Sequence, residues 1–414
     1  MSIERKKVDI VIIFRYITML FLILKTQSVF TFFTNVDLHI NLLFVSSLTI
    51  FTILRVFNKS ISLKPHKKLF IFLLVYYIYV IAYGIITKCF YRPYYVNYLV
   101  VFPLLILNIV GSKNYKDEIR NLTETFVNIV FAISIISLFF YIFGSILNII
   151  QPIDKISISW GITKKIPSYY FLHYNTQYID IFGYSIWRNS SIFTEAPMFS
   201  LCLSFALFYY MFFSKKTRNR FIVLTLVFAL ITTITFSAFL CLLLIYLMFL
   251  FEKIRKKLNK KTIILSLFIL LLLILFSSIL LIIRSKTSSI SIRFDDLKAT
   301  FKAFCDNVIF GVGMNNEKSI INYMSNFRNY NVGISNTIGI VLAEGGLYYM
   351  VFYILPFILL FNRKTNYKII FFMTFILLTS FVFVYFSTPL ILLNISILYS
   401  YTYYYFISRK EEVE

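Results

Sequence analysis

The sequence is poor in acidic residues, histidine and cysteine, and these shortages exclude several classes of site. Its 414 residues include 18 Asp and Glu against 41 Lys and Arg, with three His and four Cys. The few His and Cys residues do not suit a His-rich or Cys-rich metal centre, because neither residue type recurs at the spacing of metal ligands. Cys89 and Cys305 fall between apolar segments and could approach each other, but ordinary packing or exposure is the simpler expectation. We therefore expect no metal and no cofactor.

Apolar residues are abundant instead. They make up 59% of the chain, and aromatic residues make up 20%, with 48 Phe and 31 Tyr. A soluble domain of this length could not bury so much apolar surface, whereas a bilayer accepts it. The apolar runs are continuous rather than alternating, which excludes a transmembrane β-barrel. The composition therefore predicts an all-α polytopic membrane protein.

Apolar runs of about 18 residues or more are long enough to cross hydrocarbon. We expect about twelve transmembrane helices, at 8–25, 38–56, 69–87, 93–111, 122–149, 196–213, 220–236, 237–251, 262–283, 336–361, 369–386 and 388–406. The run 220–251 is divided at Ser237 because basic stretches flank it on both sides, at 214–220 and 252–261. Short basic loops lie in the cytoplasm, so both flanks, and both termini of the chain, are expected there.

The net charge of +23 has the same explanation. Most Lys and Arg lie in short connections between spans, as the positive-inside rule requires, so we expect a bilayer and not nucleic acid as the partner.

The chain divides into five parts: 1–149 with the first five spans, 150–195 as a first large outer loop, 196–283 with four spans, 284–335 as a second large outer loop, and 336–414 with three spans and a cytoplasmic tail. Loops this long without low-complexity sequence are usually functional. Within the second loop, Leu297, Phe301 and Phe304 lie on one face of a predicted amphipathic helix at 295–306, which we expect on the membrane surface.

The stretch WRNSSIFTEAPMFS (187–200) places Arg188 and Glu195 against an apolar segment. One interpretation is local: Thr194 caps a helix, Glu195 lies in its first turn, and Pro197 has no donor to lose there. The other is that Glu195 is catalytic. Arg188 is not explained by a helix start, although an arginine at this position can also reach a lipid phosphate. Both interpretations remain open from the sequence.

The second outer loop is rich in basic residues, against the charge rule. They are Arg284, Lys286, Arg293, Lys298, Lys302, Lys318 and Arg328. Arginine suits pyrophosphate best because its guanidinium donates two parallel hydrogen bonds. We expect Arg293 to have this role. For the lysines we favour pairing with the acidic residues of the loop, which are Asp295, Asp296, Asp306 and Glu317.

Two further motifs follow in the chain. FGVG (310–313) predicts a tight loop in which backbone approaches backbone or ligand. Asn336 can cap the next span. Glu344 lies about two turns into that span, where a carboxylate is expensive and usually functional. Gly345 and Gly346 follow it and would allow a kink or a close helix contact.

The order of these motifs resembles the superfamily of O-antigen polymerases and O-antigen ligases, polytopic glycosyltransferases of the GT-C type. The residues that carry the resemblance are Arg188, Phe193, Glu195, Pro197, Arg293, Phe310, Gly311, Gly313, Asn336, Ala343, Glu344 and Gly345. Two positions depart from the family pattern. Ser335 stands where ligases have histidine, which favours polymerisation over ligation. Ala238 follows Ser237 where the family often has a basic residue.

The resemblance implies a polymerase of undecaprenyl-pyrophosphate-linked oligosaccharide repeat units in the bacterial cytoplasmic membrane. Donor and acceptor would both be lipid-linked glycans, and a separate chain-length regulator is an expected partner. Arg188 and Arg293 would bind the pyrophosphate, and Asn336, Gly311 and Gly313 would contribute to substrate binding. A general base would be Glu195 first and Glu344 second. The aromatic residues of 150–195 could stack on sugars or form an interfacial belt.

Two other functions remain open: a lipid-linked glycan flippase and an O-antigen ligase. A flippase would keep its basic residues in a central cavity within the membrane. Here the spans themselves are poor in charge, with Arg15 the main exception, and the unexpected basic residues lie in the outer loops, which favours an enzyme that works at one surface.

Overall fold

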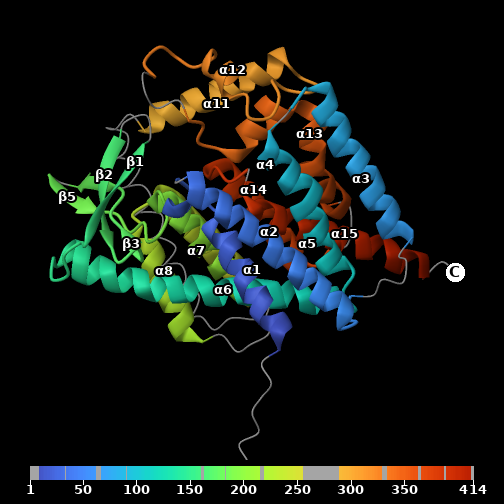
Figure 1. Ribbon diagram of the computed structural model, residues 1–414, viewed down its shortest axis with the longest axis horizontal. Helices are drawn as coiled ribbons and strands as arrows, with labels where there is room; N and C mark the ends of the chain where they lie inside the picture. The colour runs from blue at the N-terminus through green and yellow to red at the C-terminus, as the bar shows by residue number, and fades with distance from the viewer. Residues whose placement is uncertain are drawn as a thin grey trace, which may run out of the picture.

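The computed structural model describes residues 9–32, 34–61, 67–89, 91–159, 163–181, 183–214, 219–254, 289–328, 333–361, 365–386 and 388–411. The predicted span at 262–283 lies outside these residues. Six helices of the described part are long and apolar enough to cross a membrane, and four shorter apolar helices accompany them. The protein is a polytopic membrane protein with a mostly helical fold (Figure 1).

The helices of the first part are α1 (Ile10–Leu24), η1 (Val29–Phe32), α2 (Thr34–Phe57), α3 (Lys67–Ile86), α4 (Arg92–Tyr95), η2 (Val96–Val101), α5 (Phe102–Val110), α6 (Tyr115–Phe140) and η3 (Tyr141–Ile146). The helices of the second part are α7 (Ala196–Phe212), α8 (Arg220–Thr232), α9 (Phe236–Ile254), α11 (Ser289–Asp306), α12 (Glu317–Ile321), α13 (Thr337–Phe361), α14 (Tyr367–Val382) and α15 (Pro389–Glu411). Every predicted span within the described residues overlaps one of these helices.

Helix caps explain where two boundaries differ from the prediction. α6 begins at Tyr115 rather than near 122, because the Asn114 side chain accepts from the Asp117 N–H and caps a polar first turn. The division of 220–251 is confirmed, but the turn lies at 233–235 rather than at Ser237. Thr235 Oγ1 accepts from the Ala238 N–H at 3.0 Å and so starts α9 at Phe236, one residue earlier than we expected.

The first large outer loop is not irregular, so the prediction of an all-α fold is wrong. Strands β1 (Asp154–Ser159), β2 (Thr163–Tyr169) and β3 (His173–Tyr174) form an antiparallel sheet, and β4 (Tyr178–Ile181) with β5 (Tyr184–Trp187) forms a hairpin. In DKISIS, Ile156 and Ile158 alternate with polar residues, as expected of a half-buried strand. Ile156 pairs with Ile166, and both are buried against Val29 and Tyr174.

The ends of the helices form two groups, one at each end of the bundle, as expected when successive spans run in opposite directions. At one end, Ser28 after α1 bridges Phe193 before α7, and Thr337 at the start of α13 donates to the Phe383 carbonyl after α14. We call this the loop end, the end at which α1 and α14 end and α7 and α13 begin. Figure 1 shows the strands at the left and α11 and α12 at the top of the helices.

At the opposite end, Ile61 after α2 bridges Ser112 after α5. Lys368 Nζ at the start of α14 also donates to the Phe212 carbonyl at the end of α7. The outward faces between the two ends are apolar: Phe70, for example, is 66% exposed and lies on α3. Such exposure suits contact with lipid rather than water. Which end faces the cytoplasm remains a prediction from the charge pattern.

Candidate active site

The two predicted arginines and Glu195 come together at the loop end. Glu195 occupies the N-cap position of α7, but its side chain makes no capping hydrogen bond. Its carboxylate interacts instead with the charges of Arg188 and Arg293 and hydrogen-bonds the Gln177 side chain. Pro197 does lie in the first turn of α7, so the helix-start interpretation holds for Pro197 and fails for the Glu195 carboxylate.

Thr194 is not the cap that the sequence suggested. Its N–H and its hydroxyl both bond to the Gln27 carbonyl, each over 3.1 Å. The segment before α7 is thereby attached to the turn after α1. This attachment fixes the backbone that presents Glu195.

Arg188 is held at the base of the β4–β5 hairpin. Tyr178 pairs with Trp187, which places Gln177 opposite Arg188, and the Arg188 N–H donates to the Gln177 carbonyl at 2.9 Å. The guanidinium is buried: Nη1 donates to Gln177 Oε1 at 2.9 Å, and Nε donates to the Thr233 carbonyl at 3.2 Å. The hairpin that the sequence did not predict therefore orients a predicted site residue.

Arg293 reaches the same place from α11. Its Nη1 donates to the carbonyl of Val382, the last residue of α14, at 3.1 Å. Carbonyls at a helix C-terminus carry partial negative charge, so they orient a guanidinium favourably. Burial lowers the pKa of Arg293, while Asp296 and Glu195 oppose that shift. One arginine from each large outer loop thus acts on a single carboxylate.

The electrostatics of Glu195 are set by two opposing effects. Burial, the larger, raises the pKa of its carboxyl above the usual value of 4.5, while Arg188, Arg293 and the Gln177 hydrogen bond lower it. The net shift is upward. Two guanidiniums beside one carboxylate leave positive charge at the site, which suits an anionic ligand.

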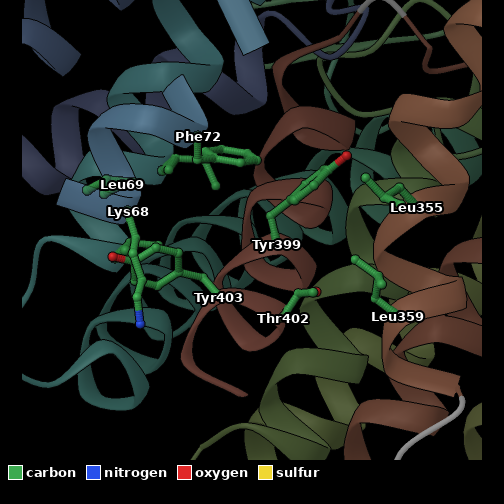
Figure 2. Close-up of a pocket in the computed structure, with 10 residues that line it drawn as sticks. Lys68, Leu69, Phe72, Leu355, Leu359, Tyr399, Thr402 and Tyr403 are labelled. Carbon is green, nitrogen blue, oxygen red and sulfur yellow. The ribbon is translucent and has the colours of Figure 1, made fainter. Parts of the chain in front are cut away.

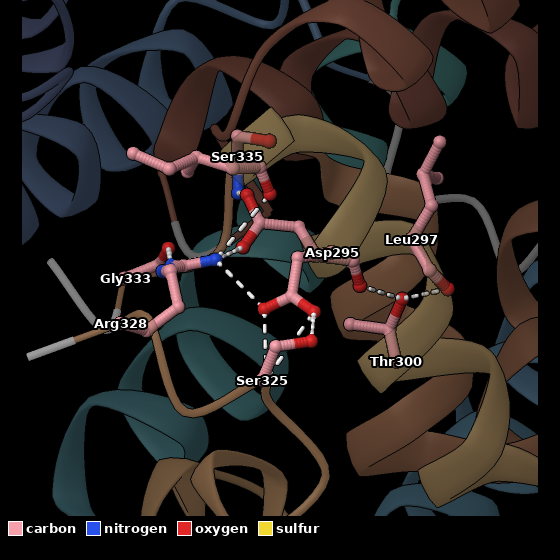
Figure 3. A network of polar contacts seen from close by, with 9 residues as sticks. Asp295, Leu297, Thr300, Ser325, Arg328, Gly333 and Ser335 are labelled. Atoms are coloured by element: carbon pink, nitrogen blue, oxygen red, sulfur yellow. Dashed lines mark hydrogen bonds and ion pairs between the residues drawn. The ribbon is translucent and has the colours of Figure 1, made fainter. Parts of the chain in front are cut away.

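α11 is positioned by a buried ion cluster (Figure 3). Arg328 Nη1 lies 2.7 Å from Asp296 Oδ1 and 3.5 Å from Asp295 Oδ2, and all three side chains are at most 4% exposed. Asp296 Oδ2 also accepts from the Ser335 N–H at 3.0 Å, and Asp295 binds Ser325. The predicted pairing of these aspartates with lysines is therefore wrong, because Arg328 is their partner.

The predicted amphipathic helix is confirmed within α11, but its buried face differs. α11 packs on α13 through small residues, with Ala299 and Ala303 fully buried. Phe301 is 61% exposed and Phe294 is 70% exposed. These two side chains are seven residues apart and share a face, which suits contact with the membrane surface.

The FGVG loop fits into a break in α13. Gly346 has φ 59° and ψ −162°, which interrupts the helix. Val312 and Gly313 donate from their N–H groups to the Ala343 and Glu344 carbonyls, and Leu347 and Tyr348 donate to the Val308 and Ile309 carbonyls. A Cβ on Gly311 would lie 2.4 Å from the Glu344 backbone, so the motif serves backbone contact. Gly313 needs glycine for its φ of 94°.

Glu344 lies in a cavity of about 260 Å³ that does not include Glu195 among its lining residues. Its side chain is 3% exposed, and Oε2 accepts from the Asn315 N–H at 3.1 Å. We call this the Glu344 cavity; it is lined by Gln27, Tyr91, Pro93, Tyr94, Asn97, Tyr98, Met314, Asn315, Gly333, Ile334, Ile340, Glu344, Val384 and Phe386. The structure thus separates the two candidate bases.

Asn336 caps α13 as predicted: Oδ1 accepts from the Gly339 N–H at 2.5 Å. Its amide nitrogen is buried and has no hydrogen-bond partner among the described residues. Asn336 also lines a second cavity of about 260 Å³, which we call the Asn336 cavity; the other lining residues are Leu297, Thr300, Phe301, Ile338, Gly339, Leu342 and Phe381. The cavity is mostly apolar and adjoins Arg293, since Leu297 is one helical turn away.

A third cavity, of about 250 Å³, lies between α3, α5, α13 and α15 (Figure 2). Its lining is apolar apart from Lys68 and the hydroxyl-bearing Tyr399, Thr402 and Tyr403. Lys68 belongs to the first turn of α3, so the cavity opens away from the loop end and takes no part in the site.

The sequence did not indicate several residues that build the site, among them His173 and Asn189. His173 is fully buried in strand β3, with Nδ1 3.5 Å from Ser137 Oγ and Nε2 3.4 Å from Ser145 Oγ. Burial lowers its pKa to about 4, so it is neutral at physiological pH. Ser137 donates to Asn189 at 2.6 Å, which fixes the residue after Arg188. Only an alternating polar pattern in HYNTQ could have suggested this network.

The described residues contain no group of three or more His, Cys, Asp or Glu that could hold a metal ion. Cys89 is buried, Cys305 is exposed, and both are free thiols.

Residues 192–346 match the model of a protein family described as O-antigen ligase. This range contains Glu195, Arg293, Asn336 and Glu344, and it begins just after Arg188. No curated protein matches the sequence.

Proposed function

We propose that the O-antigen ligase/polymerase domain of residues 192–346 makes this chain a polymerase of lipid-linked oligosaccharide repeat units. It would work at the outer face of the bacterial cytoplasmic membrane, with both termini in the cytoplasm. The observation that carries the proposal is the convergence of Arg188 and Arg293 on Glu195 at the loop end.

The donor is a glycan on undecaprenyl pyrophosphate. Its pyrophosphate binds between the Arg188 and Arg293 guanidiniums, which stabilise the negative charge that grows as the leaving group departs. The Asn336 cavity adjoins Arg293 and is mostly apolar, so it suits the isoprene units next to the pyrophosphate. The charged pyrophosphate of the donor and its apolar isoprenoid tail would thus bind side by side.

The reaction is a single displacement. A hydroxyl oxygen of the acceptor glycan attacks the anomeric carbon of the donor, the bond from that carbon to the pyrophosphate oxygen breaks, and the anomeric centre inverts. The hydroxyl proton passes to the Glu195 carboxylate. Burial that raises the pKa of Glu195 makes it a stronger base than an exposed carboxylate. Pyrophosphate that neutralises the two arginines would raise this basicity further, because their charges lower the pKa.

No metal is needed in this scheme, because two arginines supply the charge that a divalent cation would otherwise provide. Pyrophosphate is also a good leaving group, so alignment of the two substrates matters more than acid catalysis. Glu344 is less suited as the base, since it lies in a separate cavity.

Polymerisation is favoured over ligation by Ser335. It stands where ligases have histidine, and its backbone N–H is bonded to Asp296. No imidazole is present at this position to take part in ligation. A separate chain-length regulator would then set the product length.

The test is Arg188→Ala in a strain with a long surface glycan, with expression checked by immunoblot. The polymer ladder should disappear while a single repeat unit still reaches the surface. Arg220→Ala is the matched control, since Arg220 is exposed at the start of α8 at the other end of the bundle. Loss of even the single unit would indicate a flippase, and an unchanged ladder would remove Arg188 from the site.

A further inference from the structure

The Glu344 cavity differs from the two other cavities in its chemistry. The other two are lined mostly by apolar side chains, as expected for isoprenoid or acyl chains. The Glu344 cavity combines three tyrosines with three amide side chains and one carboxylate. We propose that it is a saccharide subsite that holds one sugar of the acceptor repeat unit, next to the sugar that reacts. This inference rests on the proposed polymerase function.

The side chains match the surface of a sugar. A pyranose presents an apolar face of C–H groups and a rim of hydroxyls. The three tyrosines come from one segment: Tyr91 is the N-cap residue of α4, Tyr94 lies in α4 and Tyr98 in η2. Their rings supply apolar surface with polar edges. Asn97 in the same segment adds an amide, a side chain with both donor and acceptor groups. Such sites consist of apolar walls with a few placed polar groups.

Glu344 gives the cavity its strongest acceptor. A carboxylate buried in a membrane helix is costly and is retained for function. Its backbone is rigidly held, because Val312, Gly313 and the Tyr83 hydroxyl bond to the Ala343 and Glu344 carbonyls at 2.7–3.0 Å. The break at Gly346 fixes the same segment. The carboxylate is therefore positioned before any ligand arrives, which lowers the cost of binding.

Gln27 connects this cavity to the reaction centre. It lines the cavity, its Nε2 donates to the Val384 carbonyl at 3.3 Å, and its own carbonyl accepts from Thr194, the neighbour of Glu195. Gln27 also has φ 55°, a left-handed conformation that is strained for a non-glycine residue. Such strain persists where the surroundings require it. Gln27 therefore contacts both the proposed subsite and Thr194, the neighbour of Glu195, so the next sugar of the acceptor would extend from the cavity toward Glu195.

The experiment measures binding of one probe, the repeat-unit oligosaccharide of the strain's own polysaccharide, freed of lipid. The purified full-length protein is compared with Glu344→Gln and Asn97→Leu by equilibrium dialysis of the labelled probe. Glu344→Gln keeps an oxygen for the Asn315 N–H, so the fold is expected to survive. Asn128→Leu is the matched control, because Asn128 is exposed on α6 outside the cavity. Thermal unfolding confirms that each variant is folded.

We expect both cavity variants to bind the probe at least tenfold more weakly, with Asn128→Leu within about twofold of wild type. Arg188→Ala should keep the affinity for the lipid-free probe, because that arginine is assigned to pyrophosphate. Unchanged affinity in both cavity variants would overturn the subsite, as would equal loss in Arg188→Ala.

The outcomes also separate this inference from the proposed function. If deletion of the gene abolishes the polymer but the wild-type protein does not bind the probe, the subsite is wrong and the polymerase assignment stands. If deletion leaves the polymer unchanged, the polymerase assignment itself fails, and the subsite fails with it.

Discussion

Arg188 donates from Nη1 to Gln177 Oε1 over 2.9 Å, and Gln177 in turn hydrogen-bonds the Glu195 carboxylate. One amide therefore holds the residue assigned to pyrophosphate and the residue assigned to proton transfer. Its position follows from the β4–β5 hairpin, whose terminal pair brings Gln177 opposite Arg188. We therefore assign Gln177 a positioning role and expect Arg188, Arg293 and Glu195 to contact the substrate.

Gln177→Leu should slow glycosyl transfer by about 10- to 100-fold, because a misplaced catalytic group costs rates of this order. The protein should remain folded, and the loss should fall on kcat with a smaller change in KM. Steady-state kinetics with purified lipid-linked repeat unit would measure it. Gln151→Leu is a suitable control, because Gln151 is exposed and its amide donates to the nearby Asn148 carbonyl. Equal rates in both variants would remove the positioning role.

The pH dependence of the rate should report Glu195. The base must be deprotonated, so activity should fall as the pH drops through its pKa, which burial places above 4.5. Glu195→Gln should lose most of the activity, and the residual rate should lack this acidic limb. A pH–rate profile of both proteins is the measurement. An acidic limb that persists in the variant would assign it to another group.

The same substitution should stabilise the fold at neutral pH. A carboxyl whose folded pKa is raised binds protons more tightly in the folded state, so its contribution to stability decreases as pH rises from about 4.5 through the raised pKa. Glu195→Gln removes that cost and should raise Tm at pH 7 while leaving Tm near pH 4 almost unchanged. A lower Tm at pH 7 would contradict the direction of the shift.

Gly346→Ala should disrupt the break in α13. The added Cβ would lie 2.5 Å from the Gly311 nitrogen, and φ 59° is strained for alanine, by roughly 1–3 kcal/mol before the clash. Tm of the purified protein should fall clearly. Gly333→Ala is the control, because no atom of the described residues lies within 4 Å of a Cβ there. Equal Tm values would mean that the FGVG loop does not pack into the break.

Arg328→Met should destabilise the protein by about 3–5 kcal/mol, since it leaves two buried aspartates without their cation. Denaturation in detergent measures the change. Adding Asp295→Asn and Asp296→Asn should recover part of the stability. No recovery in the triple variant would show that Arg328 contributes packing rather than charge.

The sequence predicted the transmembrane helices, because these depend on the length of the apolar runs and on the charges at their ends. The described helices follow the predicted spans, and Gly345 and Gly346 indicated the kink at 346. The strands of 150–195 were missed because each is only a few residues long and lies in a segment with strong aromatic bias. Their alternation is clear only once Ile156 is seen opposite Ile166.

The site residues divide in the same way. A charge in an unusual place identified Arg188, Glu195 and Arg293 as candidates from the sequence alone. Gln177 and Gln27 carry no charge, and their importance comes from which residues the fold places beside them. The roles of Asp295 and Asp296 were misassigned because the sequence shows several nearby cations, and only packing selects Arg328.

The central claim is tested most directly with the purified protein in liposomes and a radiolabelled undecaprenyl-pyrophosphate-linked repeat unit, with EDTA present. The account predicts a ladder of longer glycans and release of undecaprenyl pyrophosphate, both absent for Arg188→Ala and Arg293→Ala and retained for Arg220→Ala. Conversion of the repeat unit by Arg188→Ala and Arg293→Ala at the wild-type rate would contradict this mechanism. Absence of polymer from correctly folded wild-type protein would also contradict it.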